Sequence, residues 1–209
     1  RLKKAPLLKK SRTTERQRKS ATLLKFKKSD QSHIILGTRA WSIFDRRRYA
    51  LQVLADVLGG GMSSRLFRRV RDELGAAYYV RAEADLYLDH GYFCVSAGVD
   101  HQKINLVIKT ILEEMARLAR EPVGAKELQK SKDCLIGNLI LNLETSDELA
   151  GFYGMQEVLT KSMLTPDKLI EKINGVSPAA IRSAAGNIFK NAGLNLAVIG
   201  PYKNGGQFR

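Results

Sequence analysis

One stretch of the sequence combines residue types that could do chemistry with a spacing that could place them together. Arg71 lies in a helix predicted over residues 64–74, and Tyr78 follows it by seven positions at the head of the next predicted strand. At about 100° per residue, Arg71 falls at the margin of the apolar helix face, from which it can point into a cleft. Gly75 breaks the helix and lets the chain reverse, so Tyr78 could lie beside Arg71.

The residue types alone leave two interpretations of this pair open. Arg often lays its apolar stem along a surface, and Tyr often lies at an interface, so both residues could be structural. Both could equally serve a binding or catalytic cleft. Three glycines, Gly59, Gly60 and Gly61, precede the helix and permit a sharp reversal and the close approach of another chain.

The histidines follow no metal-binding pattern. No two of the three histidines, His33, His90 and His101, are three or four positions apart in the sequence. The sequence also contains no HxxEH, HExxH, GxSxG, P-loop or GxGxxG motif. A catalytic zinc site usually needs three protein ligands and an open position. We therefore expect the three histidines to be structural or solvated, with no metal bound by this chain.

The positive charge gathers at the beginning of the chain. The net charge is +14, and residues 1–28 hold 12 Lys or Arg against one acid, Glu15. This pattern predicts a basic linker or arm over residues 1–21, followed by one domain over 22–209. Binding of nucleic acid by the arm is the alternative, but Phe26 is the one aromatic residue in 1–28 on which a base could stack. Because the chain begins with Arg1 and not Met, we also expect a fragment or a processed form.

Hydrophobic periodicity predicts an α+β domain, with a mostly antiparallel sheet and helices packed on one of its faces. The predicted strands cover residues 22–28, 32–37, 80–88, 93–99 and 194–199. The predicted helices cover residues 45–58, 64–74, 104–118, 124–143, 147–159, 166–173 and 178–189, with Asp45 as the N-cap of the first. No apolar run approaches the roughly 18 residues that cross a bilayer.

Two cysteines, Cys94 and Cys134, are separated by 40 residues and show no CxxC spacing. We interpret them as buried, reduced thiols, although a disulfide between them stays possible. Together with the missing signal peptide, reduced thiols favour a cytoplasmic location.

A longer segment around Arg71 and Tyr78 carries a family resemblance. The stretch GGGMSSRLFRRVRDELGAAYYV resembles the signature of the second half of inverzincin metallopeptidases, the pitrilysin, insulin-degrading enzyme and mitochondrial processing peptidase family. The segments HIILG, DRRRYALQVLADVL, GYFCVSAGVD and AVIGP also fit, so the resemblance covers roughly residues 22–202. Ala76 and Tyr79 depart from the common Leu and Ser without changing the spacing between Arg71 and Tyr78.

The resemblance implies the C-terminal half of a zinc metalloendopeptidase, which closes over a substrate cleft as one half of a clamshell. Zinc would be bound by an HxxEH-bearing half or partner subunit that this sequence lacks. Tyr78 would be the oxyanion donor and Arg71 a clamp on substrate carbonyls, both counted as catalytic, with Gly59, Gly60 and Gly61 as substrate-binding residues. The chain alone would be inactive.

The same resemblance implies the partners and leaves one alternative. We expect a peptide substrate, a homodimer or heterodimer in the complete enzyme, no membrane contact and no nucleic acid. The alternative is a non-catalytic subunit or structural homologue, of the kind found among processing peptidases and respiratory-complex core proteins. An HxxEH motif in the remainder of the parent protein would separate the two.

Overall fold

A computed structural model of the chain describes residue 11 and residues 13–208. The predicted order of two strands, two helices, two strands, several helices and a closing strand is confirmed. In chain order the elements are β1 (Ala21–Phe26), β2 (Ser32–Ala40), α1 (Arg48–Gly59), η1 (Phe67–Glu73), β3 (Ala77–Leu86), β4 (Gly91–Val99), α2 (Ile104–Arg120), α3 (Ala125–Leu141), α4 (Ser146–Thr160), α5 (Pro166–Asn174), α6 (Pro178–Ile188), η2 (Asn191–Gly193), β5 (Asn195–Gly200) and η3 (Gly206–Phe208).

The five strands form one open sheet in the order β1-β5-β2-β4-β3. β1 pairs with β5 in parallel, and the other neighbours are antiparallel, so the sheet is mostly antiparallel as predicted. The register of β2 and β4 sets Ile34 opposite Ala97 and Leu36 opposite Val95. All four side chains are buried, whereas Ile35, between the two β2 residues, is 50% exposed. This alternation gives the sheet one buried and one open face.

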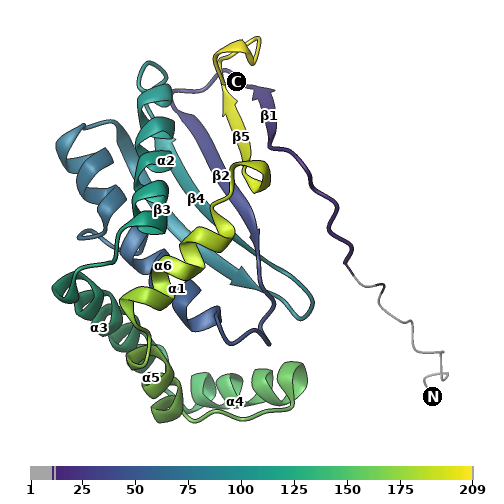
Figure 1. Ribbon diagram of the computed structural model, residues 1–209, viewed down its shortest axis with the longest axis vertical. Coiled ribbons are helices and arrows are strands. Elements are labelled where there is room, and N and C mark those ends of the chain that lie inside the picture. Colours follow the sequence, from purple (N-terminus) through teal and green to yellow (C-terminus); the bar gives the residue numbers. More distant parts are fainter. Residues whose placement is uncertain (1–10, 12, 209) are drawn as a thin grey trace.

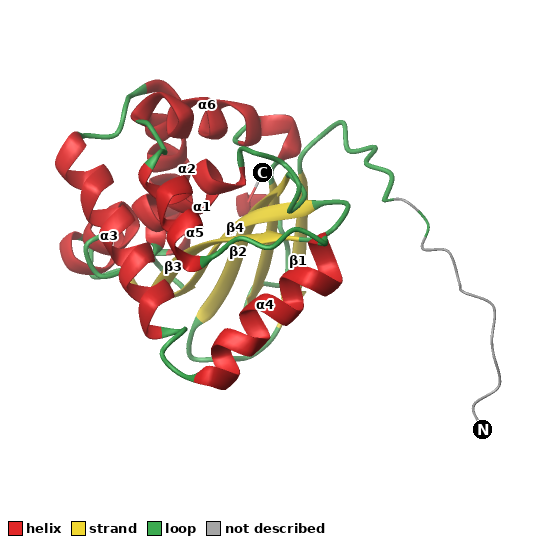
Figure 2. Cartoon of the chain, turned by 90° about the horizontal axis from the view of Figure 1, so that it is seen from below, coloured by secondary structure: helices red, strands yellow, loops and turns green. Residues whose placement is uncertain are grey.

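Helices α1, α2 and α6 cover the buried face of the sheet, and α3 and α5 pack against α1 (Figure 1). In the view from below, most helices gather on one side of the strands, and α4 crosses in front of the strands (Figure 2). Helix α4 lies apart at the bottom of Figure 1 and buries none of its residues. No helix in the described part of the chain has the length and apolar character needed to cross a membrane.

Local sequence signals explain where the later helices begin. Ser177 is the N-cap of α6, and its hydroxyl accepts a hydrogen bond from the Ala180 N–H at 3.1 Å. Thr165 and Thr145 cap α5 and α4 in the same way. Pro occupies the first turn of α5 and α6, where its missing N–H costs nothing, as the sequence predicts.

Two local predictions, on Asp45 and on the burial of the cysteines, are wrong, and the prediction of a helix over 64–74 is refined. Asp45 does not cap α1, because α1 begins at Arg48 and the Asp45 carboxylate accepts bonds from the backbone and guanidinium of Arg47 instead. The helix predicted over 64–74 is largely a π-helix, with i→i+5 bonds such as Leu74 N–H to the Arg69 carbonyl. The cysteines are both free as expected, but Cys134 is exposed on α3, and Cys94 is only half-buried because it alternates with the buried Phe93 and Val95 along β4.

Residues 13–20 of the predicted arm run along one end of the sheet, and residues 1–10 and 12 lie outside the described residues. The Thr13 hydroxyl donates to Asp89 in the β3–β4 turn at 2.8 Å. Glu15 pairs with Arg39 at the end of β2 at 3.1 Å. The Gln17 amide bonds to Asn195 at the start of β5. The described part of the arm therefore contacts the domain at three places.

Because Gly59 has no side chain, α1 can approach β3 closely at this position. A Cβ at this position would lie 2.5 Å from the Ala82 backbone nitrogen. We expect Gly59→Ala to lower the free energy of unfolding by about 1–3 kcal/mol, because backbone atoms cannot yield as a flexible side chain does. Urea denaturation measures the change.

Gly61→Ala is the matched control, because a Cβ at Gly61 meets nothing within 4 Å. Its unfolding free energy should stay within about 0.5 kcal/mol of the parent chain. Equal effects of the two substitutions would contradict the packing role of Gly59.

Candidate functional site

The short helix that carries Arg71 is held by its apolar side. Leu66 and Val70 are fully buried against the core, so the backbone beneath Arg71 has a defined position. The Ser64 hydroxyl donates to the Gly61 carbonyl at 2.6 Å and closes the turn that leads into the helix. Arg71 itself is exposed, and its guanidinium carbon lies 5.0 Å from the centre of the Phe67 ring. This cation–π contact holds the side chain along the helix while its donors stay accessible.

Gly75 ends the helix in the left-handed conformation, with φ of +50°. This region suits glycine, so the break predicted from the sequence is confirmed. The Lys103 ammonium donates to the carbonyls of Leu74 and Gly75, at 3.3 and 3.1 Å. A cation at a helix C-terminus satisfies the free carbonyls and the negative end of the helix dipole. The turn that precedes Tyr78 is thus fastened to the start of α2.

Tyr78 lies at the head of β3, as predicted, and at an irregularity in its pairing. Ala77 pairs with Val99 and Tyr79 with Gly98, so Tyr78 is the extra residue of a β-bulge. A bulge redirects a side chain out of the regular alternation. Tyr78 is 58% exposed. Arg71 and Tyr78 are therefore both accessible, on consecutive elements joined by one turn, and no hydrogen bond joins them among the described residues.

The three glycines differ in their surroundings. Gly59 is buried against β3, Gly60 ends α1 and lies over the Asp56 side chain, and Gly61 is exposed with open space around it. Burial raises the pKa of the Asp56 carboxyl above its ordinary value. Packing accounts for glycine at Gly59, and Gly61 leaves its backbone open to another chain.

The sequence did not reveal an ionic cluster that fastens this helix to α2. Glu114 has no solvent exposure, and its carboxylate accepts hydrogen bonds from Arg69 at 2.7 Å and Arg117 at 3.0 Å. Arg65 Nη1 lies 3.7 Å from the other carboxylate oxygen. The Arg65 fork also binds Glu127 of α3 in a bidentate pair at 2.7 and 2.8 Å. The hydrogen bonds that Arg65 donates to Glu127 raise the pKa of Arg65, and the bond that Arg69 donates to Glu114 raises the pKa of Arg69.

A signal for this cluster is present in the α2 sequence. Val107, Ile111 and Leu118 follow each other at helical spacing on the buried stripe, and Glu114 falls on the same stripe. A carboxylate at a core position requires a cationic partner. Such a partner could have been sought among the arginines of the preceding helix.

The histidines do not fit a zinc site. His33 Nδ1 bonds to the Tyr79 hydroxyl at 3.1 Å, and His90 Nδ1 bonds to Asp89 at 2.9 Å. His101 is occupied on both nitrogens, by the Ser32 hydroxyl and the Ser29 carbonyl. Within the described ranges no three His, Cys, Asp or Glu side chains gather as metal ligands do. Burial raises the pKa of the Cys94 thiol to about 11, which leaves it protonated and a poor ligand near neutral pH.

Comparison with known proteins identifies the family. The family model described as "Peptidase M16 inactive domain" matches residues 1–135. This chain belongs to the peptidase M16 family. The match begins within the basic arm and continues through the glycines, Arg71 and Tyr78 into α3.

Curated relatives of this M16 domain are named zinc proteases. An uncharacterized zinc protease of Bacillus subtilis is 34% identical over 182 residues, which is 87% of this chain and 44% of the relative. An uncharacterized zinc protease of Streptomyces coelicolor is 33% identical over 178 residues, 85% of this chain and 39% of the relative. The chain spans less than half the length of these relatives.

A solved structure has the same fold. The structure described as a peptidase M16 inactive domain from Pseudomonas fluorescens superposes with a TM-score of 0.80 at 17% identity. The superposition covers 88% of this chain and 44% of that one. The α+β fold and the family resemblance read from the sequence are both confirmed.

We expect the Glu114 cluster to be the strongest polar contribution to the position of the Arg71 helix. Glu114→Gln removes the charge that Arg65, Arg69 and Arg117 share, and leaves the buried part of the cluster uncompensated. The free energy of unfolding, measured in urea, should fall by about 3 kcal/mol or more.

Glu113→Gln is the control on the same helix. Glu113 is 43% exposed and lies 3.4 Å from Arg69, so its pair is screened by water. Its loss should cost under about 1 kcal/mol. A Glu114→Gln variant no less stable than Glu113→Gln would refute the structural role of the cluster.

Proposed function

We propose that this M16 domain forms one side of a peptidase cleft whose zinc-bearing side is supplied by an HxxEH half or partner subunit. The observation that carries the proposal is the accessibility of Arg71 and Tyr78 on a rigid backbone. Both side chains are exposed, while Leu66, Val70 and Ala76 around them are buried. Side chains that contribute to a shared active site need this combination of a fixed base and free functional groups.

The chemistry that suits Tyr78 is stabilisation of negative charge. Attack on a peptide bond places charge on the carbonyl oxygen, and a phenol hydroxyl donates a strong hydrogen bond to it. The β-bulge directs Tyr78 away from the sheet pairing, so its hydroxyl is available to a substrate. Removing such a donor removes an interaction that forms mainly in the transition state.

The chemistry that suits Arg71 is substrate binding. Its guanidinium lies against Phe67 and has no carboxylate partner in the described part of the chain, which leaves its donors for carbonyl oxygens of a bound peptide. Gly61, close to the same helix and open on its surface, permits a peptide backbone to approach. The names of the relatives agree with peptide hydrolysis as the reaction of the complete protein.

Tyr78→Phe tests the catalytic role in the complete protein that carries both halves. The substitution keeps the ring and removes the hydroxyl, so kcat for a peptide substrate should fall by roughly 10²-fold or more with little change in KM. Tyr87→Phe, which removes another partly exposed phenol hydroxyl just after the end of β3, is the control and should keep kcat within about twofold. Undiminished turnover by Tyr78→Phe would exclude the role.

Arg71→Gln tests substrate binding. Loss of the guanidinium should raise KM by about tenfold and lower kcat less, because the contact exists before and during the reaction. Steady-state kinetics on the same substrate separates the two constants.

A complete protein without an HxxEH motif and without peptidase activity would instead support the non-catalytic subunit considered from the sequence.

A further inference from the structure

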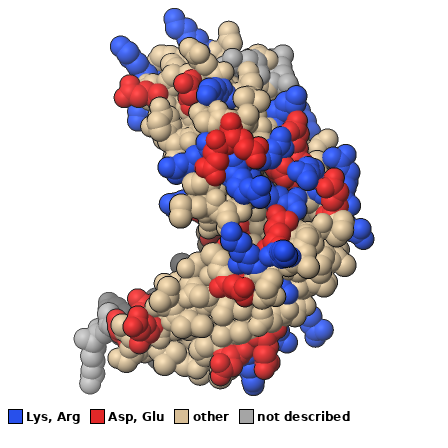
Figure 3. Space-filling model, turned by 90° about the vertical axis from the view of Figure 1, so that its left-hand side faces the viewer, with Lys and Arg blue, Asp and Glu red and all other residues tan. Residues whose placement is uncertain are grey.

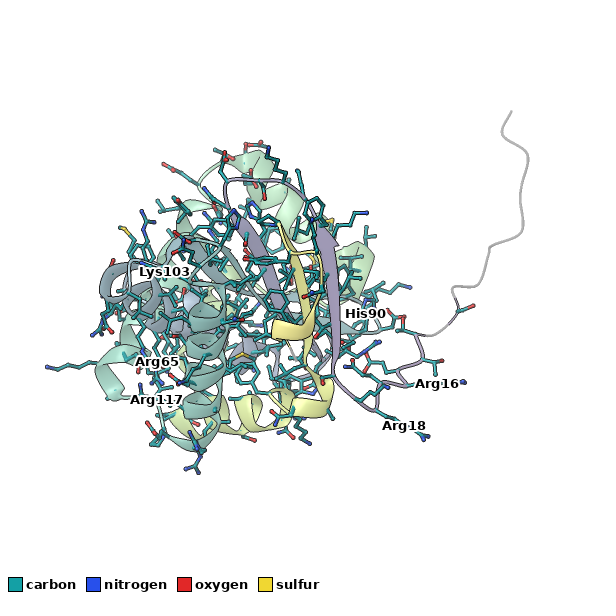
Figure 4. The ribbon with its side chains drawn as sticks, turned by 90° about the horizontal axis from the view of Figure 1, so that it is seen from above. Arg16, Arg18, Arg65, His90, Lys103 and Arg117 are labelled. Atoms are coloured by element: carbon teal, nitrogen blue, oxygen red, sulfur yellow. The ribbon has the colours of Figure 1, made fainter. Side chains whose placement is uncertain are left out.

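Away from Arg71 and Tyr78, a hollow of about 860 Å³ opens between η1, α2 and α3. Three carboxylates line this basic hollow together with six cationic side chains, which are Arg65, Arg68, Arg69, Arg117, Lys126 and Lys130. Figure 3 shows basic side chains gathered with acidic ones across the middle of this face of the molecule. Figure 4 shows Arg65 and Arg117 next to each other beside α2, on the side opposite Arg16 and Arg18.

The floor of the basic hollow already binds carboxylates. Arg69 and Arg117 hold Glu114, and Arg65 holds Glu127 through both arms of its fork. The bidentate pair of Arg65 with Glu127 shows that the arginine fork matches the planar geometry of a carboxylate. These internal pairs also fix the floor, so a ligand would not have to order it.

The cations at the rim have no such partners. Arg68, Lys126 and Lys130 are exposed, and the structure gives their charged groups neither a hydrogen bond nor an ion pair among the described residues. Arg68 belongs to η1, whereas the two lysines belong to the first turns of α3, so the free charges converge from two walls. Lys126 also lies at the positive end of the α3 dipole, which increases the local positive potential.

An apolar hollow of about 660 Å³ adjoins the basic hollow on the other side of α2. Arg69 and Arg117 line both hollows. The lining of the apolar hollow includes Ile108, Leu112, Met115, Phe189 and Leu194, and charged side chains such as Lys109 and Arg120 stand beside them. Each hollow falls in the size range of ligand sites, and together they extend beyond the reach of a single small anion.

We propose that the two hollows together dock an acidic peptide segment of a partner protein. Its carboxylates would pair with Arg68, Lys126 and Lys130, and an apolar side chain of the segment would enter the apolar hollow. Successive same-side residues of an extended peptide are roughly 7 Å apart, so its carboxylates can pair with cations that stand on separate walls. The surface uses neither Arg71 nor Tyr78 and is therefore independent of the proposed cleft.

Fluorescence anisotropy of a labelled peptide with alternating Glu and Asp around one Leu tests the proposal. The wild-type chain should bind it, with an affinity that falls steeply as salt increases. The double variant R68Q/K130Q should raise Kd by about tenfold or more, because two charge-assisted contacts are lost. K25Q/K27Q removes the same charge at the exposed β1 edge and should leave Kd within about twofold.

A second pair of measurements tests the apolar hollow. Replacing the peptide Leu by Ser should weaken binding to the wild type by roughly fivefold, and this difference should shrink in Leu112→Ala. Circular dichroism establishes that each variant is folded.

Equal Kd values for R68Q/K130Q and K25Q/K27Q, or equal binding of a Gln/Asn version of the peptide, would overturn the proposal. So would displacement of the peptide by inorganic pyrophosphate below the peptide's own Kd, since that result identifies a small-anion site.

Discussion

The carboxylate of Glu114, enclosed without solvent exposure among three arginines, is the interaction on which the rest of the arrangement depends. It joins α2 to the helix that carries Arg71, and Arg65 extends the connection to α3 through Glu127. A charge in this position is tolerated because its partners are present, and it becomes costly once one of them is lost. The apolar side chains of Leu66 and Val70 hold the helix against the core, and the ionic cluster holds it against α2 and α3.

The region between that helix and β3 holds several features that are rare in regular structure. Bonds of the i→i+5 type widen the helix, Gly75 adopts a left-handed conformation, and β3 begins with a bulge at Tyr78. Each feature changes the direction of the chain, and π-helical segments and bulges are often found at functional sites. They follow one another within a few residues, between the exposed side chains of Arg71 and Tyr78.

The short helix carries residues of two surfaces. Arg71 lies against Phe67 and outside the basic hollow, which Arg65, Arg68 and Arg69 line. A partner that docks on the second surface would contact the same rigid helix that presents Arg71. Binding there and events in the cleft therefore share one structural element, although they use different side chains.

Periodicity and turn residues were enough to determine the order of the elements, the mostly antiparallel sheet and the helix stop at Gly75, because these depend on local patterns. The identity of Arg71 and Tyr78 as candidate residues also came from the sequence, through their types and a motif. The failure of Asp45 to cap α1 comes from its bonds to Arg47, two residues on, and the π-type bonding from i→i+5 bonds within one helix. The bulge at Tyr78 depends on pairing with a strand distant in the chain. The same is true of the Glu114 cluster, which joins residues more than forty positions apart. The sequence alone placed the Glu114 carboxylate on an apolar helix stripe. Only the packing of α2 against its neighbours decided which arginines neutralise that charge. A buried charge is stable only where the fold brings oppositely charged partners to it.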